Sequence, residues 1–380
     1  MSAGVERGPR KPGVKGFIFS SDGWPVLVSP AIVIAIVLEL MHADAIAIFA
    51  AAALGLIPAA AVMGRATEEL AARSGPGIGG LLNVTFGNFP ELIIAILALN
   101  AGLHELVKAS LVGSIIGNIL LVMGLAMFVG GLKRPKQIFN ATAASVQSGM
   151  LLLAAAALVM PAVFELISGT GLPDPGDGII NYDSQVEKIS LIAAVILLVS
   201  YVGGMIFSLV THKSLFNPAH DDESGEFAWP VKKSMAVLFG ASLVVGFMSE
   251  ILVGSIEDAS HAIGLSEFFV GVFVVAIVGN AAEHWVAVLV AWKDKMDLAV
   301  NIAIGSSAQV ALFVAPVLVL LSFVLGPHPM ALVFNGYELA AIVIALITAN
   351  MITSDGESTW FEGLQLLALY AVFGTVFYFA

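Results

Sequence analysis

The sequence predicts an all-α membrane protein with eleven transmembrane helices, one extra N-terminal helix followed by two inverted five-helix repeats. Three observations predict this fold: the composition, the recurrence of long apolar segments, and a motif that occurs twice. The 380 residues are 59% hydrophobic and only 12% charged. Because soluble domains carry about 25% charged residues, this composition excludes a soluble enzyme, a nucleic-acid-binding protein and a disordered chain. The chain has no Cys, which excludes disulfides and thiolate metal sites.

Eleven apolar segments are long enough to cross the hydrocarbon core of a bilayer as helices. The boundary between the first two is the least distinct, because only residues 42–44 separate them. The segments are too long for a β-barrel and show no alternation of apolar and polar residues. They lie near residues 26–42, 44–63, 78–102, 107–131, 143–168, 187–211, 234–254, 265–292, 298–325, 329–352 and 360–379.

The Lys and Arg residues predict the orientation of these spans. With eleven spans the two termini lie on opposite sides of the membrane. Fourteen Lys and Arg residues then fall on the N-terminal side, and only Lys108 and Lys188 fall on the other side. Since basic loops stay on the cytoplasmic side, we expect a multi-pass protein of the cell (inner) membrane. Its N-terminus is expected to be cytoplasmic and its C-terminus to lie on the opposite side.

The same spans divide the chain into four parts. Residues 1–43 form a cytoplasmic N-terminus and the first helix, and residues 44–211 form the first five-helix repeat. Residues 212–233 form a cytoplasmic loop with four acidic residues between 221 and 226, and residues 234–380 form the second repeat. The acidic loop is either a solvated connection or a weak attractor of cations. Thr67 is expected to cap a short interfacial helix before the third span.

The repeat is visible as a motif of the form G-N-x-x-E. It reads G-N-F-P-E at residues 87–91 and G-N-A-A-E at residues 279–283, and the two copies are 192 residues apart. Without any gap, eight of the thirty positions from 87 to 116 are identical at this offset. Because each repeat holds five helices, an odd number, the second copy enters the membrane from the opposite side, as in many secondary transporters.

Each motif places a carboxylate in the middle of the membrane. Glu91 is thirteen residues into its span, which corresponds to a depth of roughly 20 Å, and Glu283 is at the matching depth. An ionisable residue at this depth is a functional residue by default. Two carboxylates on a pseudo-two-fold axis form a hard-oxygen site that suits a divalent cation such as Ca²⁺. Asn88 and Asn280 can add amide oxygens.

The residues around the carboxylates predict broken helices, in which backbone carbonyls are freed to face the site. Gly87 and Pro90 weaken the helix at the first motif, and broken helices of this kind are typical of transporters. Two adjacent carboxylates in a low dielectric cannot both stay ionised without a cation, so at least one is expected to bind a proton. Protons and the metal would then compete for one site, which predicts antiport.

Further polar residues are candidates for supporting this site. Asn118 and Gln309 are large polar groups in apolar spans and are expected to face the site. Glu250, expected one turn from the end of its helix, is either an access-path or proton-relay acid or an interfacial group in water. His284 is expected to face another side of its helix than Glu283. The supporting residues are therefore Ser114, Asn118, Ser306, Gln309 and Glu250.

Several motifs together resemble the Ca²⁺/H⁺ antiporter, or cation/proton exchanger, family of the Ca²⁺/cation antiporter superfamily. The resemblance runs from about residue 64 to residue 325. It implies eleven helices, two inverted repeats and alternating access. It also implies cation ligation by Glu91 and Glu283, with backbone oxygens near Gly87 and Gly279. The motifs are A-T-E-E at 66–69, G-G-L-L-N at 79–83, G-N-F-P-E-L-I at 87–93, K-A-S-L-V-G-S-I-I-G-N at 108–118, T-H-K-S-L-F at 211–216, G-N-A-A-E-H at 279–284 and G-S-S-A-Q at 305–309.

We therefore expect a secondary transporter that exports cytoplasmic Ca²⁺ in exchange for H⁺, with Ca²⁺, H⁺ and the lipid bilayer as its partners. No cofactor and no nucleic acid are expected, and the sequence leaves open whether copies of the chain assemble. The alternative is a Na⁺/Ca²⁺ exchanger of the same superfamily. In Na⁺/Ca²⁺ exchangers, a hydroxyl residue is expected four positions before each of the two Glu residues. This chain has Gly87 and Gly279 at those positions. Inverted broken helices argue against a channel. An enzyme lacks support, because no nucleophile–base pair or metal–histidine set occurs.

Overall fold

The computed structural model describes residues 24–74, 79, 82, 85–169, 171–175, 184–212 and 229–380. The regular secondary structure of this part of the chain is helical apart from one two-stranded antiparallel pair, β1 (Gln137–Ile138) with β2 (Glu357–Ser358). The N-terminal residues 1–23 and the acidic segment 221–226 lie outside it. In chain order, the helices are α2 (Trp24–Val28), α3 (Pro30–Leu40), α4 (Ala45–Arg73), α6 (Phe89–Asn100), α7 (His104–Ile116), η1 (Gly117–Val122), α8 (Met123–Gly131), α9 (Ala141–Ser168), α10 (Ser184–Ile206), η2 (Phe207–Thr211), α12 (Val231–Ile263), α13 (Glu267–Phe269), η3 (Val270–Val275), α14 (Ala276–Trp292), α15 (Met296–Gln309), η4 (Val310–Val314), α16 (Ala315–Ser322), α17 (Gly336–Ile352) and α18 (Trp360–Phe379).

Lengths and compositions of these helices are those of a multi-pass membrane protein. Among the described residues, eight helical runs are long and apolar enough to cross a membrane. Three shorter apolar helices, Pro25–Leu40, Phe89–Asn100 and Gly336–Ile352, fall at the first, third and tenth predicted spans. The predicted separation of the first two spans is confirmed. His42 has a φ of 50°, and the Asp44 side chain caps α4 by accepting bonds from the N–H groups of Ile46 and Ala47.

Three of the long helical runs contain a π-helical segment, which lies near the middle of two runs and near the start of the third. Segments η1, η3 and η4 interrupt the runs His104–Gly131, Glu267–Trp292 and Met296–Ser322. Segment η1 begins at Gly117 and η4 begins at Val310, which matches the motif spacing of 192 to within one residue. Because π-helical turns occur frequently at functional sites, their position after the two Gly-Ser pairs directs attention to the centre of the bundle.

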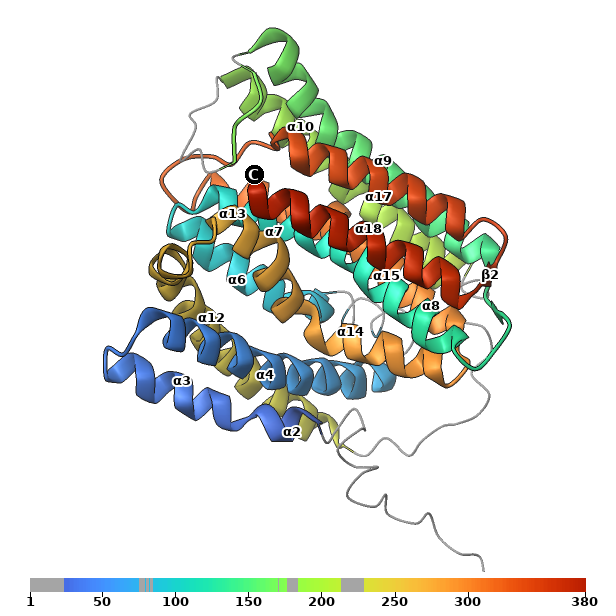
Figure 1. Ribbon diagram of the computed structural model, residues 1–380, viewed down its shortest axis with the longest axis horizontal. Helices are drawn as coiled ribbons and strands as arrows, with labels where there is room; N and C mark the ends of the chain where they lie inside the picture. Colours follow the sequence, from blue (N-terminus) through green and yellow to red (C-terminus); the bar gives the residue numbers. More distant parts are fainter. Residues whose placement is uncertain are drawn as a thin grey trace, which may run out of the picture.

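The helices form two groups with α6 and α14 between them (Figure 1). Helices α4 and α12 pack along much of their length and have α3 beside them. The second group contains α7, α8, α9, α10, α15, α16, α17 and α18. Helix α6 contacts α12 on one side and α7 on the other, and α14 contacts both α4 and α8. The two elements that carry the G-N-x-x-E motifs therefore lie in the interior of the molecule.

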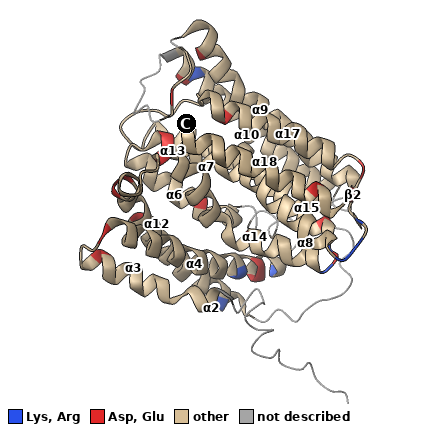
Figure 2. Ribbon diagram, in the orientation of Figure 1, with Lys and Arg blue, Asp and Glu red and all other residues tan. Residues whose placement is uncertain are grey.

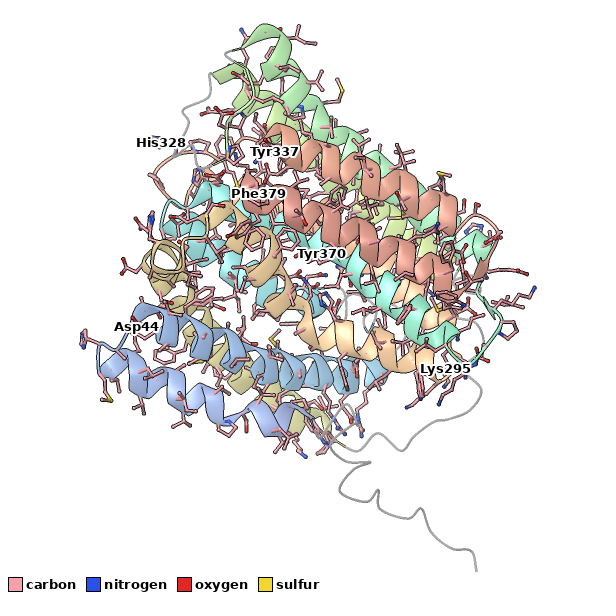
Figure 3. The ribbon with its side chains drawn as sticks, viewed as in Figure 1. Asp44, Lys295, His328, Tyr337, Tyr370 and Phe379 are labelled. Atoms are coloured by element: carbon pink, nitrogen blue, oxygen red, sulfur yellow. The ribbon has the colours of Figure 1, made fainter. Side chains whose placement is uncertain are left out.

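Side chains on the outer helices fit a lipid environment. Leu152 on α9, Val199 on α10 and Val372 on α18 each expose more than half of their surface. Exposed apolar belts of this size mark a membrane-facing surface. Figure 2 shows most Lys and Arg residues near the end of the bundle that holds β2 and the last turn of α8, while the helix surfaces between the ends are largely uncharged. Figure 3 places Lys295 at that end and Asp44 and His328 at the other.

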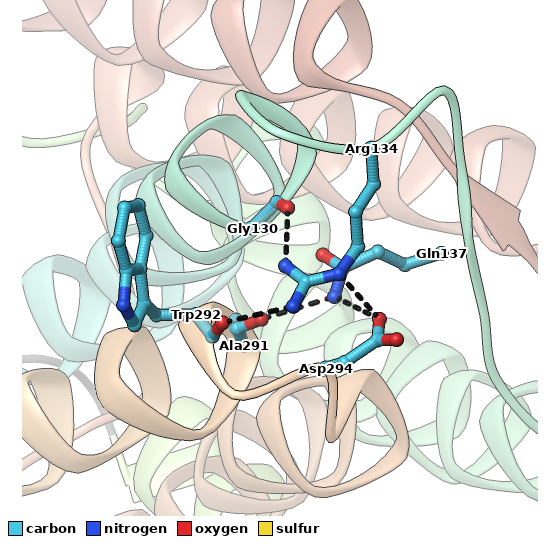
Figure 4. Close-up of polar contacts among 6 residues, drawn as sticks. All are labelled: Gly130, Arg134, Gln137, Ala291, Trp292 and Asp294. Atoms are coloured by element: carbon cyan, nitrogen blue, oxygen red, sulfur yellow. Dashed lines mark hydrogen bonds and ion pairs between the residues drawn. The ribbon is translucent and has the colours of Figure 1, made fainter.

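A polar network joins α8 to α14 at the basic end (Figure 4). The Arg134 guanidinium donates to the carbonyl oxygens of Gly130 (3.1 Å) and Trp292 (3.3 Å), which lie at the C-terminal ends of the two helices. It also forms an ion pair with Asp294 at 3.3 Å, and the Gln137 amide donates to the same carboxylate at 2.8 Å. A cation at two helix C-termini is stabilised by the unpaired carbonyls and the helix dipoles. The network fixes this end of α14.

The predicted tenth span is only partly helical. Helix α17 begins at Gly336, and residues 330–335 form a buried non-helical segment instead. The N–H groups of Met330 and Leu332 donate to the hydroxyls of Ser322 (2.8 Å) and Ser190 (2.9 Å). Backbone polar groups away from water need such partners. Hydropathy could not show this irregularity, because the M-A-L-V-F sequence is as apolar as a spanning helix.

The seventh span also differs from its prediction. It was expected over residues 234–254, whereas α12 runs from Val231 to Ile263. The helix passes through a polar C-terminal stretch that contains Glu257, Asp258 and His261. It ends only where Gly264 adopts the left-handed conformation, with a φ of 78°. The helix stop, rather than the loss of hydrophobicity, therefore sets the length of α12.

We predict that Lys108→Met destabilises the protein by about 1–3 kcal/mol, because the buried carbonyl of Val333 loses its charged donor. Lys108 is 9% exposed, its ammonium donates to the carbonyl oxygen of Val333 at 2.9 Å, and it interacts electrostatically with the buried Glu338. Thermal unfolding of the detergent-purified protein should show a lowered Tm. The exposed Lys188→Met is the matched control and should change Tm little; equal shifts in the two variants would contradict this role of Lys108.

Candidate functional site

The two motif carboxylates meet at the centre of the bundle, and each lies against the glycine of the other motif. A Cβ atom placed on Gly87 would lie 3.5 Å from Oε1 of Glu283. A Cβ atom placed on Gly279 would lie 3.1 Å from Cγ of Glu91. The crossing of α6 and α14 is therefore reciprocal, and both glycines leave room for the opposite carboxylate. The sequence prediction that Glu91 and Glu283 lie close together agrees with this geometry.

Each carboxylate accepts a hydrogen bond from a serine on the following helical run. The Ser114 hydroxyl donates to Oε1 of Glu91 at 2.9 Å, and the Ser306 hydroxyl donates to Oε2 of Glu283 at 2.6 Å. Both serines follow their glutamate by 23 residues. The two halves of the site are thus built from equivalent positions, and the structure brings both predicted serines to the carboxylates.

The amide side chains complete the polar cluster less symmetrically. The amide nitrogen of Asn280 donates to Oε1 of Glu91 and, at 3.1 Å, to the Ser114 hydroxyl. The amide nitrogen of Asn88 instead donates to Oε1 of Gln309 at 2.6 Å. The structure therefore brings Asn280 to Glu91 and joins Asn88 to Gln309 as a second polar pair. The carbonyl oxygens of these amide side chains can act as cation ligands when the amides turn, since carboxylates and amide carbonyls are the groups that Ca²⁺ prefers.

Two further residues lie near this region. The imidazole of His284 lies 3.2 Å from the side-chain oxygen of Asn118 on η1, whereas the adjacent Glu283 contacts Ser306. Glu68 interacts electrostatically with Glu283. The expected interfacial helix at Thr67 is wrong: α4 is continuous through Arg73, and the Thr67 hydroxyl bonds back to the carbonyl oxygen of Met63 at 2.9 Å. The continuous run of Ala, Glu and Leu after Thr67 was the signal for this longer helix.

The prediction of broken helices is confirmed at the first motif and wrong at the second. Asn88 is a turn residue, and α6 begins at Phe89 with Pro90 in its first turn. In contrast, α14 is regular from Ala276 to Trp292, and the irregular turn η3 lies earlier in the chain. The second motif has two alanines where the first has Phe-Pro, and alanine is the strongest helix former. The Gly279 carbonyl therefore lies inside a regular helix and is not freed.

Glu250 is not where the sequence placed it. It is exposed on α12, thirteen residues before the last residue of the helix, Ile263, and not one turn from its end. Within the described part of the chain, no hydrogen bond or ion pair joins Glu250 to the two motif glutamates. The greater length of α12 is the reason for the error.

A narrow pocket leads away from Glu91. Its wall is mostly apolar, with Ser110 and Ser114 as the exceptions, so Glu91 is placed in a medium of low dielectric. The lining consists of Glu91, Ile94, Ala95, Ser110, Leu111, Ser114, Val275, Ala276, Val310 and Val314. An uncompensated carboxylate in such surroundings is strongly unfavourable, which creates a demand for a cation or a proton at this position.

Together these features define a class of protein: a multi-pass helical membrane protein with two facing carboxylates, each held by a serine, at the centre of its bundle. The sodium/calcium exchanger protein family matches residues 44–210 and 233–379. The chain belongs to this family. Its members are transporters and not enzymes.

Relatives with curated names cover almost the whole chain. A Ca²⁺/H⁺ antiporter ChaA of Bacillus subtilis (strain 168) is 43% identical over 357 residues, which are 93% of this chain and 98% of the relative. A Ca²⁺/H⁺ antiporter of Aphanothece halophytica is 42% identical over 353 residues, covering 89% and 92% of the two chains. The solved structure of native YfkE has a TM-score of 0.79 and 42% identity, and the match covers 93% of this chain and 99% of that one.

We predict that Gly279→Ala lowers the stability of the protein by about 1–3 kcal/mol more than Gly87→Ala, as overpacking of a filled site does. Only the new methyl group at position 279 would be crowded, against Cγ of Glu91 at 3.1 Å, whereas the one at position 87 would make an ordinary contact with Glu283 at 3.5 Å. Thermal unfolding of the two variants side by side measures the difference. A Gly87→Ala variant that unfolds at the lower temperature would contradict the reciprocal arrangement described above.

Proposed function

We propose that this protein is a secondary transporter that exports cytoplasmic Ca²⁺ in exchange for H⁺, with both cations competing for the site between Glu91 and Glu283. The single observation that carries the proposal is the reciprocal contact of the two motifs, which holds two carboxylates together in the interior of an apolar bundle. The names of the relatives that are more than 40% identical support the same cations.

The donor set favours a divalent cation with oxygen ligands. Two carboxylates provide a charge near −2. Asn280 contacts Glu91, and Asn88 is next to Gly87, the residue that faces Glu283. The break before α6 frees backbone carbonyls near Gly87, whereas the regular turn at Gly279 does not. We therefore assign the backbone contribution to the first motif. Oxygen-only coordination of this kind is typical of Ca²⁺.

Charge balance explains why the two cations exchange. With both carboxylates ionised and no cation, the site carries two negative charges in a low dielectric, which is strongly unfavourable. Binding one Ca²⁺ neutralises the site, and so does binding two protons. Only these neutral forms can pass through an occluded state at low free energy. A Ca²⁺ ion delivered to one side must then be replaced by protons before the site returns. We propose that this alternation of access is the coupling step.

The proposed topology has eleven spans, in two inverted five-helix repeats after an extra first helix. Eight long and three shorter apolar helices support this count among the described residues. The equal 23-residue spacing of the two Ser–Glu pairs supports the repeat. The two stretches matched by the family lie on either side of the central loop at 212–233. With Lys and Arg gathered at one end, the N-terminus is proposed to be cytoplasmic and the C-terminus to lie across the cell membrane.

The Na⁺/Ca²⁺ alternative is less well supported by the site. The positions four residues before each glutamate are Gly87 and Gly279, which bring no side-chain oxygen toward the opposite carboxylate. Compared with a site that has hydroxyl residues at these two positions, this site has fewer oxygen ligands with which to bind several Na⁺ ions. The two serines that contact the glutamates are engaged one to each carboxylate. Proton coupling needs no ligands beyond the carboxylates themselves.

We predict that Glu91→Gln and Glu283→Gln each reduce Ca²⁺/H⁺ exchange at least a hundredfold while leaving the protein folded. Glutamine keeps the shape of the side chain but neither titrates nor supplies the charge that the divalent cation requires. Proton-gradient-driven ⁴⁵Ca²⁺ uptake into proteoliposomes measures exchange, and thermal unfolding measures folding. Glu39→Gln is the matched control because this residue is exposed at the end of α3; it should retain full exchange. Substantial exchange by either site variant would refute the two-glutamate site.

A further inference from the structure

A second cluster of ligand-forming side chains lies at the junction of α12 and α13, at the end of the bundle opposite the Arg134 network (Figure 1). Glu257 and His261 are on the last turns of α12, and Glu267 is the first residue of α13. One ligand atom from each side chain lies within 4.8 Å of the other two. None of the three residues belongs to the G-N-x-x-E motifs, and none is hydrogen-bonded to Glu91 or Glu283 in the described part of the chain.

The local backbone places the three side chains together. Glu257 and His261 are four residues apart on one helix, so they project from the same face. The chain then reverses at Gly264, whose left-handed conformation closes α12. Ser266 caps the following helix by accepting a hydrogen bond from the N–H of Phe269 at 3.1 Å. This short, doubly capped turn brings Glu267 alongside the end of α12.

The charges of the cluster are not balanced by basic residues. Glu267 interacts electrostatically with both Glu257 and His261. In the part of the chain that the structure describes, no Lys or Arg forms an ion pair with either carboxylate. Two carboxylates at this separation repel each other. A bound divalent cation would neutralise the pair.

We propose that Glu257, His261 and Glu267 form a binding site for a divalent transition metal such as Zn²⁺, separate from the transport site. Imidazole nitrogens and carboxylate oxygens are both Zn²⁺ ligands, and three protein ligands leave the fourth tetrahedral position to water. Zn²⁺ bonds of about 2.0–2.1 Å would bring the ligand atoms closer than they are now, and the exposed side chains of Glu257 and His261 are free to close. Ca²⁺ prefers six to eight oxygen ligands and is disfavoured by the imidazole.

A metal bound at this site would connect the end of α12 to the start of the helical run that carries Glu283. Helix α12 packs against α4 and α6, while the run that begins at Glu267 continues through η3 into α14 and carries Glu283. A metal bridge between Glu267 and the end of α12 therefore fixes the start of the helix that carries one of the two proposed transport carboxylates.

The test is a Zn²⁺ titration by calorimetry of the full, tag-free protein with Glu91→Gln and Glu283→Gln in place, so that the transport site does not contribute. We expect one Zn²⁺ to bind per chain. His261→Ala or Glu267→Gln should lower the affinity for Zn²⁺ at least tenfold. Asp258→Asn should leave the affinity for Zn²⁺ within twofold of the parent. Asp258 is the matched control because it is an exposed acid next to Glu257 and outside the cluster. Zn²⁺ should raise the Tm of the parent but not of the His261→Ala variant.

Two outcomes would overturn the proposal. One is Zn²⁺ binding that is unchanged by both His261→Ala and Glu267→Gln. The other is tighter binding of Ca²⁺ than of Zn²⁺ at this site, which would show that the imidazole is not a ligand. The same Zn²⁺ titration is repeated on the wild-type protein with excess Ca²⁺, which occupies the transport site. This control does not depend on the folding of the glutamine variants. Because the site is tested without transport, a failure here leaves the proposed exchange activity untouched.

Discussion

Two carboxylates held against each other inside an apolar bundle are unfavourable unless a cation or protons join them, and the interior of this protein is arranged around that constraint. Glu91 and Glu283 meet only because Gly87 and Gly279 leave space at the crossing of α6 and α14. Each carboxylate receives one serine hydroxyl. These contacts hold the two charges in place without neutralising them, so the demand for a mobile cation remains. That demand is the physical basis of the proposed exchange.

The two halves of the site are equivalent in their serines but differ in their backbone. The break at Asn88 leaves the first motif with freed backbone groups, whereas the second motif sits in a regular helix that is fixed at its end by the Arg134 network. His284 and Asn118 add a further contact on one side only. The site therefore combines a helix start at the first motif with a regular helix at the second.

Much of this arrangement could be predicted from the sequence, because it follows from apolar length and from a motif repeated at a fixed offset. The pairs Glu91 with Glu283 and Ser114 with Ser306 follow from that offset, and Gln309 is found as a large polar residue in an apolar span. Features that depend on tertiary contacts could not be predicted. The non-helical segment 330–335 is apolar and is held by side chains from distant helices. Two other errors had local causes that the hydropathy pattern hid. The length of α12, which misplaced Glu250, is set by the left-handed Gly264, and the regular backbone at Gly279 is favoured by the alanines that follow it.

We propose that H⁺, and not Na⁺, is the cation exchanged for Ca²⁺ at the two-glutamate site. The most direct test is ⁴⁵Ca²⁺ uptake into inside-out proteoliposomes under an imposed pH gradient, with and without Na⁺. We expect ⁴⁵Ca²⁺ uptake to be driven by an acidic vesicle interior in the complete absence of Na⁺. Uptake that required a Na⁺ gradient and ignored the pH gradient would contradict it, and would place the coupling ion at ligands other than the two carboxylates.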